Sequence, residues 1–547
     1  MPQLSLCLAA LCLLAAPARG QVPADQTPLD QYLQKADDSY SWKIISEKTV
    51  GGVHLIVVDM ISQTWRTAEE VDRPQWQHWL TLAIPEKVRS ETGLLFIGGG
   101  ANGRQPPAAP NERIMQISQA TGTLVAELSM VPNQPLVFHQ DGQRRTEDDL
   151  VGYTWDQYLR TGDPTWPARN PMVKSALRAM DTMTAVAAAP AGGEQTVNKF
   201  VVAGGSKRGW TTWLTGLDPR VVAIVPIVID VVNAEPSMKH HFAAYGFWAP
   251  AVGDYVAHKI MERLDHPRLT DLYRLVDPYY YRHRLTMPKY ILNAAGDQFF
   301  LPDSSQFYFD ELQGEKYLRY VPNADHGLGG SDAQESLIAF YSTIVSGRPR
   351  PRFSWSEQAD GAIRVVAEDA PGEVRLWQAN NPEARDFRLE TLGPKYTSSV
   401  LESEGDGVYI GRVAQPEQGW TAYFVELTYD VGAPVPLKLT TSVRVIPDVL
   451  PYQEKRPDLP TTISIVCEAE SEEAAKKIVG SQAEIAQRLD VANFTASCFG
   501  KRCYFNWKPQ DELERPVVML TEYLKQQKCK SFQCQLESGA GTTGAKP

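Results

Sequence analysis

Residues 199–210 read Lys199-Phe-Val-Val-Ala-Gly-Gly-Ser-Lys-Arg-Gly-Trp210, and this stretch decides how the rest of the chain is interpreted. A β-branched run ends in two glycines, Ser206 follows, and a helix-forming segment begins behind it. This order is typical of a nucleophile elbow, in which a strand ends, the chain turns sharply and a serine is raised above the sheet edge at the start of a helix. The stretch predicts a serine hydrolase whose nucleophile is Ser206.

The elbow departs from the common form Gly-x-Ser-x-Gly, because Gly209 comes one position late and Arg208 occupies the tight position. Some carbohydrate esterases have a similar elbow with a basic residue after the serine, so the variant is compatible with catalysis. Two roles are open for the basic pair. Either Lys207 and Arg208 bind a substrate carboxylate, as arginine forks do, or Arg208 forms a buried ion pair.

A serine nucleophile needs a base and an acid that orients the base, and α/β-hydrolases place them along the chain in the order serine, acid, histidine. Residues 289–297 read as an apolar strand that ends in Asp297, and residues 317–326 as a strand and loop that end in His326. Open α/β sheets place their sites at the carboxyl ends of strands, so we predict a triad of Ser206, His326 and Asp297. The rival acid is Asp303, which the sequence also allows to cap a helix that begins behind it.

The oxyanion intermediate needs backbone N–H donors. One is expected from Lys207, the residue after the nucleophile, and another from the loop after an early strand. Residues 98–103 read Gly-Gly-Gly-Ala-Asn-Gly behind the apolar run 94–97, and glycine lets a backbone approach a substrate closely. We therefore assign the oxyanion hole to Lys207, Gly99 and Gly100. The alternative is that the glycines form only a flexible turn.

The composition narrows the range of partners. The chain has 547 residues, 43% of them hydrophobic, and a formal net charge of −11. This acidic balance gives no electrostatic reason to expect a nucleic acid as partner. No segment after the N-terminus approaches the ~20 apolar residues of a membrane helix, so we expect no membrane span in the mature chain. The expected substrate is a small molecule, a glycan ester or a peptide.

The pattern of elements predicts several domains. Residues 21–350 alternate apolar strands with helical stretches, which predicts an α/β-hydrolase fold with a mostly parallel sheet flanked by helices. Residues 351–447 read as short strands and turns, typical of a small β-sandwich. Residues 448–537 contain an acidic helix at about 471–489 and a group of cysteines, and we expect the Gly/Thr/Lys tail 538–547 to be disordered.

The N-terminus and the cysteines predict export. An apolar run with small residues behind it makes 1–20 a signal peptide, with cleavage near Gly20. Disulfides are favoured over zinc for the C-terminal cysteines, because no histidine lies nearby and their spacing fits a zinc site poorly. Asn493 begins an N-glycosylation acceptor triplet. The cysteines of the mature chain are Cys467, Cys498, Cys503, Cys529 and Cys534.

Residues of about 28–355 resemble the PhoPQ-activated pathogenicity-related proteins. The resemblance implies an α/β-hydrolase fold and places Ser206, Asp297 and His326 at the triad positions. The segment after Asp297 also resembles the acid loop of the prolyl-oligopeptidase relatives, which leaves peptide substrates open. The stretches that carry the family resemblance are 62–66 (Ser-Gln-Thr-Trp-Arg), 76–79, 154–158, 178–181, 204–215, 218–230, 240–246, 277–279, 293–304 and 314–323.

We therefore expect a secreted serine hydrolase that cleaves an ester or an amide through an acyl-enzyme, with no cofactor and no metal. Adjacent histidines project apart on regular elements, so His240 and His241 are expected to have a structural or pocket-lining role rather than to bind metal. The alternative is a secreted signalling, growth-regulating or binding protein on a hydrolase scaffold, with a possible cell-surface partner. It stays open because a fold alone does not fix a function.

Overall fold

A computed structural model describes residues 26–108, 111–264, 266–453, 463–489, 491, 494–507 and 514–536. The predicted signal peptide at 1–20, the glycosylation acceptor Asn493 and the tail 538–547 lie outside these residues. Within the described part of the chain, no helix has the length and apolar character needed to cross a membrane.

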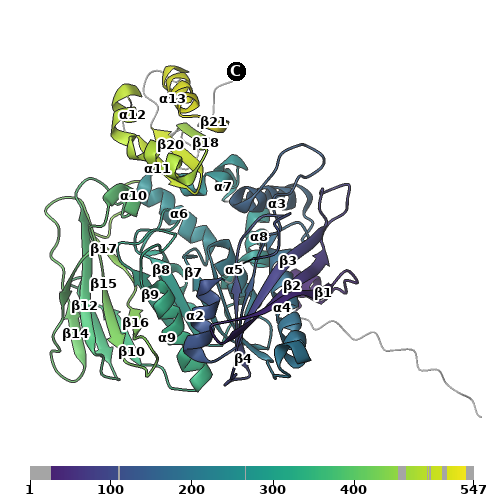
Figure 1. Ribbon diagram of the computed structural model, residues 1–547. Coiled ribbons are helices and arrows are strands. Elements are labelled where there is room, and N and C mark those ends of the chain that lie inside the picture. The colour runs from purple at the N-terminus through teal and green to yellow at the C-terminus, as the bar shows by residue number, and fades with distance from the viewer. Residues whose placement is uncertain are drawn as a thin grey trace, which may run out of the picture.

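One large sheet organises the molecule, with the strand order β1-β2-β3-β5-β4-β6-β7-β8-β9-β16-β15-β12-β13. The strands from β5 to β9 run parallel in this order, and helices connect them, which is the arrangement of an α/β-hydrolase fold (Figure 1). These strands are β4 (Thr92–Ile97), β5 (Val125–Leu128), β6 (Lys199–Gly205), β7 (Val221–Ile227), β8 (Lys289–Ala294) and β9 (Lys316–Val321).

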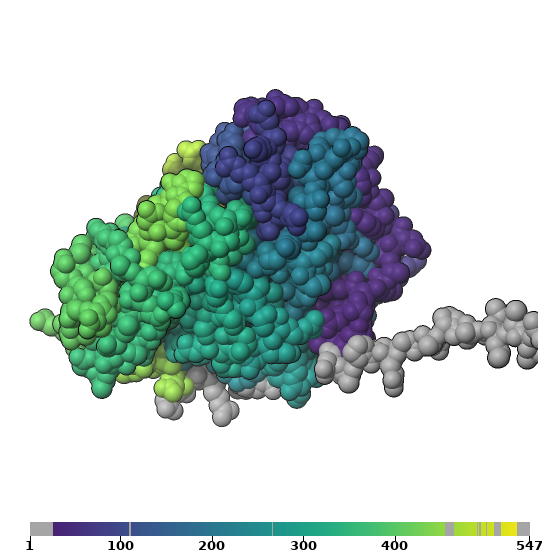
Figure 2. All heavy atoms as spheres, turned by 90° about the horizontal axis from the view of Figure 1, so that it is seen from below, coloured from purple at the N-terminus to yellow at the C-terminus, as the bar shows by residue number. Residues whose placement is uncertain are grey.

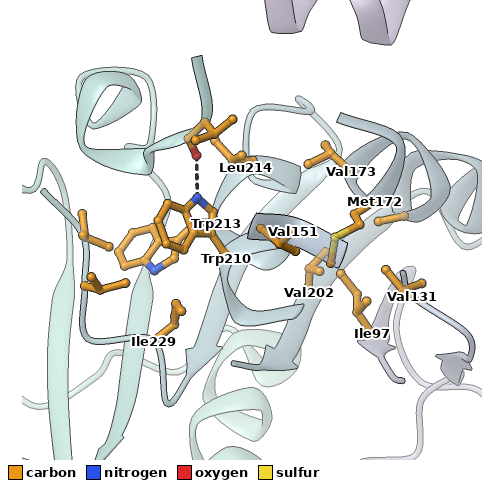
Figure 3. Packing of buried hydrophobic residues seen from close by; sticks show 14 of the residues in the cluster. Ile97, Val131, Val151, Met172, Val173, Val202, Trp210, Trp213, Leu214 and Ile229 are labelled. Atoms are coloured by element: carbon orange, nitrogen blue, oxygen red, sulfur yellow. Dashed lines mark hydrogen bonds between the residues drawn. The ribbon is translucent and has the colours of Figure 1, made fainter. Parts of the chain in front are cut away.

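The parallel strands are buried on both faces, which explains their continuous apolar sequence. Val202 of β6 packs in one hydrophobic cluster, and its neighbours Val201 and Ala203 pack in the other. Figure 3 shows the first of these faces, where Val202 and Ile97 lie among side chains of the covering helices. The main helices of this part are α2 (Glu112–Thr121), α3 (Glu147–Thr161), α4 (Arg169–Ala188), α5 (Lys207–Thr215), α6 (Ala234–Tyr245), α7 (Gly253–Ala257), α8 (Pro267–Val276) and α9 (Ala333–Ser346).

The N-terminal edge of the sheet differs from the strand–helix alternation expected for residues 21–350. After the short helix α1 (Pro28–Gln34), three long antiparallel strands follow one another directly: β1 (Ser41–Val50), β2 (Val53–Thr64) and β3 (Gln75–Pro85). The strand β2 is buried along most of its length, whereas β1 is largely exposed. The antiparallel edge thus extends the parallel core without crossover helices.

Residues 353–446 form antiparallel strands, as expected. A sheet of β10 (Phe353–Glu357), β11 (Ile363–Ala367) and β14 (Val408–Gly411) packs beside strands of the large sheet, because Val365 and Val425 share one hydrophobic cluster. Seen from below, this region is continuous with the hydrolase part (Figure 2). The other strands here are β12 (Glu373–Asn381), β13 (Thr397–Val400), β15 (Trp420–Tyr429), β16 (Leu437–Thr440) and β17 (Arg444–Ile446).

Strand pairing and a buried ion pair join the β-rich region to the hydrolase strands. Thr440 of β16 pairs with Leu318 of β9, so the sheet continues past residue 350. Arg319 on β9 is 1% exposed and forms an ion pair with Glu426 on β15, which is 2% exposed. Asp332 lies 3.0 Å from the same guanidinium. The two regions therefore share a sheet and a buried charge pair.

The C-terminal module, residues 463–536, lies above α3 and α7 in Figure 1. Its sheet has the order β19-β20-β18-β21, and the predicted single helix at 471–489 is wrong, because the chain breaks it at Ser481. The elements are β18 (Ile463–Glu468), α11 (Glu472–Gly480), α12 (Gln482–Leu489), β19 (Thr495–Phe499), β20 (Arg502–Trp507), α13 (Glu514–Gln526) and β21 (Lys530–Leu536).

The four cysteines whose side chains are described form no disulfide in the structure. They are close to one another, however, since Cys503 of β20 pairs across the sheet with Cys467 on one side and Cys498 on the other. Among the described residues no group of His, Cys, Asp or Glu side chains is arranged to hold a metal ion. Disulfide formation in this module stays a prediction.

The Arg319–Glu426 pair provides a test of how the two regions are joined. Arg319→Met should lower the free energy of unfolding by about 3–5 kcal/mol, because it removes the arginine from the buried Glu426 carboxylate and leaves only the more distant Lys438, at 4.0 Å. The double variant Arg319→Met/Glu426→Leu should recover most of this loss in urea denaturation. A double variant as unstable as the single variant would contradict this account.

Candidate active site

Ser206 lies at the turn between β6 and α5 with φ 57° and ψ −128°, a conformation that L-residues seldom adopt. Its backbone N–H is held by the carbonyl oxygen of Ile227 at the end of β7, at 2.8 Å. Strain of this kind persists only where the surroundings enforce it, and it concentrates at functional sites. The structure therefore forms, at Ser206, the sharp strand–turn–helix geometry that the sequence predicts.

The glycines of the elbow explain its unusual spacing. A Cβ on Gly204 would lie 2.8 Å from the carbonyl oxygen of Arg208, and one on Gly209 would lie 2.8 Å from that of Ile227. A Cβ on Gly205 would meet nothing closer than 3.9 Å. Gly204 and Gly209 are thus the positions where backbone packs against backbone. Arg208 is tolerated between them because its side chain leaves the turn.

That side chain enters a buried ion cluster, which decides between the two roles left open for the basic pair. Arg208 donates two hydrogen bonds to the carboxylate of Glu147, both at 2.7 Å. Lys207, whose side chain is 1% exposed, lies 2.8 Å from Glu147 and 3.0 Å from Asp148. Burial opposes ionisation of Glu147, but Lys207 and Arg208 outweigh it and hold its pKa well below the usual range.

The predicted glycine loop lies beside the elbow, because Ile97 of β4 is in register with Gly204 of β6. A Cβ on Gly99 would lie only 2.7 Å from the Arg208 guanidinium, and Gly100 has φ 138°. The Arg208 Nε donates to the carbonyl oxygen of Val131, whose N–H donates to that of Gly98. Arg208 thus fastens the glycine loop to the first turn of α5, where the Lys207 N–H follows Ser206.

Asp297 and His326 meet where the sequence predicted them, behind β8 and β9. The His326 Nδ1 lies 2.8 Å from the Asp297 Oδ2, and both side chains are 3% exposed. The Asp297 Oδ1 accepts a hydrogen bond from the Phe299 N–H at 2.7 Å. The Gln298 side chain accepts one from the His326 N–H at 2.8 Å. The loop after β8 therefore holds the histidine at both its ring and its backbone.

Ser206 lines an apolar pocket that lies beside this pair. Phe299 lines the pocket together with Ser206, and the Phe299 ring lies 4.3 Å from that of His326, centre to centre. The cavity measures about 50 Å³. Most of its wall is aliphatic or aromatic, from Trp155, Trp210, Ile229, Val231, Met238, Val252, Ile260, Met261, Tyr273 and Phe300.

Trp210 and Trp213 lie three residues apart on α5 but have different surroundings. Trp213 is fully buried in the core (Figure 3), whereas Trp210 also lines the pocket. The Arg169 guanidinium lies 4.5 Å over the Trp210 ring and donates to the carbonyl oxygen of Lys207 at 2.9 Å. Burial lowers the pKa of Arg169, and its hydrogen bond to Lys207 holds the backbone directly after Ser206.

The rival acid Asp303 has other partners. It lies 3.1 Å from the Nε2 of His240 and 2.6 Å from the guanidinium of Arg385, which comes from the β-rich region. His241 is fully buried, accepts a hydrogen bond from the Ala249 N–H, and has its pKa lowered to about 3 by burial. The structure therefore gives both histidines structural contacts, as the sequence predicted.

One buried acid at the same sheet edge was not predicted from the sequence. Asp230, which follows β7, is 2% exposed and accepts hydrogen bonds of 2.6 Å from the hydroxyls of Tyr308 and Tyr320. Burial raises its pKa to about 7, although the two tyrosines act in the opposite direction. The sequence does show an acid behind an apolar strand at this position. It does not show that two tyrosines distant in the chain bind it.

The pKa of Asp230 predicts how stability depends on pH. Because it is raised from 3.8 to about 7, the native state holds a proton there that the unfolded state releases above pH ~4. The free energy of unfolding should then fall as pH rises from ~4 to ~7, by on the order of 4 kcal/mol for this group.

Asp230→Asn removes the titration but keeps an acceptor for one tyrosine. In chemical denaturation, its stability relative to the wild type should therefore rise as pH rises from ~4 to ~7 and stay level above that. Parallel pH curves for the two proteins would contradict the assignment.

Comparisons with known proteins identify relatives that match most of the chain. The family model of the PhoPQ-activated pathogenicity-related proteins matches residues 29–388. Autocrine proliferation repressor protein A from Dictyostelium discoideum is 38% identical over 459 residues, which cover 78% of this chain and 92% of that protein.

Solved structures with a similar fold are distant in sequence. Acetyl xylan esterase 1 from Thermoanaerobacterium sp. matches with a TM-score of 0.41 and 12% identity, over 58% of this chain and 93% of that one. The S-formylglutathione hydrolase from Agrobacterium tumefaciens matches with a TM-score of 0.34 and 14% identity, over 56% and 98%. From the family model and the curated relative together, the chain belongs to the PhoPQ-activated pathogenicity-related protein family.

Proposed function

We propose that this protein is a serine hydrolase that cleaves an ester or an amide through an acyl-enzyme. The observation that carries the proposal is the Asp297–His326 hydrogen bond of 2.8 Å, beside a pocket that Ser206 lines from a strained elbow. Nucleophile, base and orienting acid are the minimum set for acyl transfer by serine.

The chemistry follows from the tautomer that Asp297 selects. When His326 donates its Nδ1–H to Asp297, its Nε2 carries the lone pair and serves as the base for the Ser206 hydroxyl. Ser206 then attacks the substrate carbonyl, and His326 returns the proton to the leaving group. Water repeats these steps and releases the acyl group.

The developing oxyanion is assigned to the N–H of Lys207 and to the glycine loop at Gly99 and Gly100. Lys207 lies at the N-terminus of α5, where backbone N–H groups and the helix dipole favour negative charge. Its own ammonium is engaged by Glu147 and Asp148, so its contribution comes from the backbone.

The pocket supports a small apolar group on one side of the scissile bond. Its cavity measures about 50 Å³ and its wall is mostly aliphatic and aromatic, which favours a short acyl group over a long fatty-acyl chain.

Hydrolysis by single-residue variants tests the triad. On a panel of short-chain aryl esters, sugar-acid esters and dipeptidyl amides, Ser206→Ala and His326→Ala should each lower kcat by about 10⁴-fold or more. Asp297→Asn should cause a loss of similar order through the wrong tautomer. Asp303→Asn is the matched control for a buried acid, and its kcat should stay within an order of magnitude of wild type on the same substrates. Equal losses in Asp297→Asn and Asp303→Asn would contradict the assignment.

The glycine loop has its own test. Gly99→Ala places a methyl group 2.7 Å from the Arg208 guanidinium and should lower kcat by about 10²-fold, the effect of disturbing one oxyanion donor, with little change in KM. Gly205→Ala is the matched control, because its Cβ meets nothing closer than 3.9 Å. A Gly99→Ala variant as active as Gly205→Ala would exclude this loop from the oxyanion site.

A second candidate function is secreted growth regulation, and the 38% identity to autocrine proliferation repressor protein A supports it. The predicted signal peptide is consistent with export, which N-terminal sequencing of the protein from culture medium would test. If Ser206→Ala keeps full effect on cell proliferation, that function does not use the hydrolytic site.

A further inference from the structure

A second cavity adjoins the pocket of Ser206. It measures about 370 Å³, and Asp148 and Phe299 line both cavities. The two cavities therefore share part of their walls, and the larger one, called the chamber below, lies next to the pocket.

The wall of this chamber opposite the hydrolase part comes from the C-terminal module. Residues from β18, from β20 and the turn before it, and from β21 contribute to it. They are Val466, Cys467, Glu468, Lys501, Arg502, Tyr504 and Ser531. In Figure 1 the module lies above α3 and α7, the helices that supply the facing wall.

Specific contacts hold the module in place. The Arg502 guanidinium lies 2.8 Å from the carboxylate of Asp254, which begins α7 and is 5% exposed. Tyr504, which is 6% exposed, packs on Gly253, where an added Cβ would lie 3.5 Å from the ring. Burial raises the pKa of Asp254 to about 7, although Arg502 acts in the opposite direction. A contact between a partly exposed arginine and a buried carboxyl, together with a buried aromatic ring, distinguishes this interface from a loose association of two domains.

The two cavities differ in chemistry. The pocket beside Ser206 is mainly apolar, whereas the chamber is lined by charged groups of both signs. A substrate that fills both has a small apolar group on one side of the reacting carbonyl and a polar or charged group on the other. The acidic groups lining the chamber are Glu147, Asp148, Asp149, Asp254 and Glu468, and the basic ones are Arg144, Lys501 and Arg502.

We propose that the C-terminal module forms the outer wall of the substrate site and restricts the enzyme to short substrates that join a small apolar group to a polar one. This inference rests on the proposed hydrolase function. The module blocks the direction in which a polymer would extend, so an ester or amide within a long chain does not reach Ser206.

Active-site labelling tests this without knowledge of the natural substrate. The second-order rate constant for labelling of the full-length protein is measured with a compact dialkyl fluorophosphonate and with the same reactive group coupled to dextran. The wild type should strongly favour the compact reagent. In Arg502→Glu the ratio of the two rate constants should fall by about tenfold or more, because losing the arginine beside the buried Asp254 carboxyl weakens docking at least that much.

Two further variants make the result specific. Lys477→Glu reverses an exposed charge on α11, away from both cavities, and should keep the wild-type ratio. Asp254→Arg/Arg502→Glu restores the pair with opposite polarity and should return the ratio toward wild type, which separates loss of docking from misfolding of the module. Equal labelling by both reagents in the wild type, or an unchanged ratio in Arg502→Glu, overturns the inference. Absence of labelling by the compact reagent overturns the proposed hydrolase function, and the inference with it.

Discussion

The ion cluster beneath the nucleophile is the interaction on which the rest of the site depends. Lys207 and Arg208 follow Ser206 directly, and both are tied to Glu147 at the start of α3. Arg208 also contacts the loops at Gly99 and Val131. This ion cluster therefore links α5, the glycine loop and α3. It fixes the positions of the nucleophile, the glycine loop and the start of α3 relative to each other.

Charges in such a cluster are costly to bury, and removing one partner costs more than the pair contributes. Substitution of any one of Lys207, Arg208, Glu147 and Asp148 should therefore destabilise the protein. The ion cluster also explains how an arginine stands where the common elbow has glycine. In this elbow the position that needs close backbone approach is Gly209, because a Cβ there would meet the carbonyl oxygen of Ile227. Position 208 can therefore carry an arginine, which forms the ion cluster.

The sequence predicted the residues that carry local signals. Ser206, Asp297 and His326 each follow an apolar run, so their strand ends could be found and their meeting at one sheet edge inferred. Glu147 could not be assigned this way, because its partner Arg208 lies 61 residues away in the chain. Asp230 was missed for the same reason, since its tyrosines lie on a distant loop and on β9. The break at Ser481 and the docking of Arg502 on Asp254 also depend on tertiary contacts.

The central claim is that Ser206 is a nucleophile activated by His326 and Asp297. Peptide mapping by mass spectrometry after reaction with a compact fluorophosphonate tests it most directly. The account predicts a single modified residue, Ser206, and no modification once His326 is replaced by alanine. Modification of another residue, or a folded wild type that does not react, would contradict it.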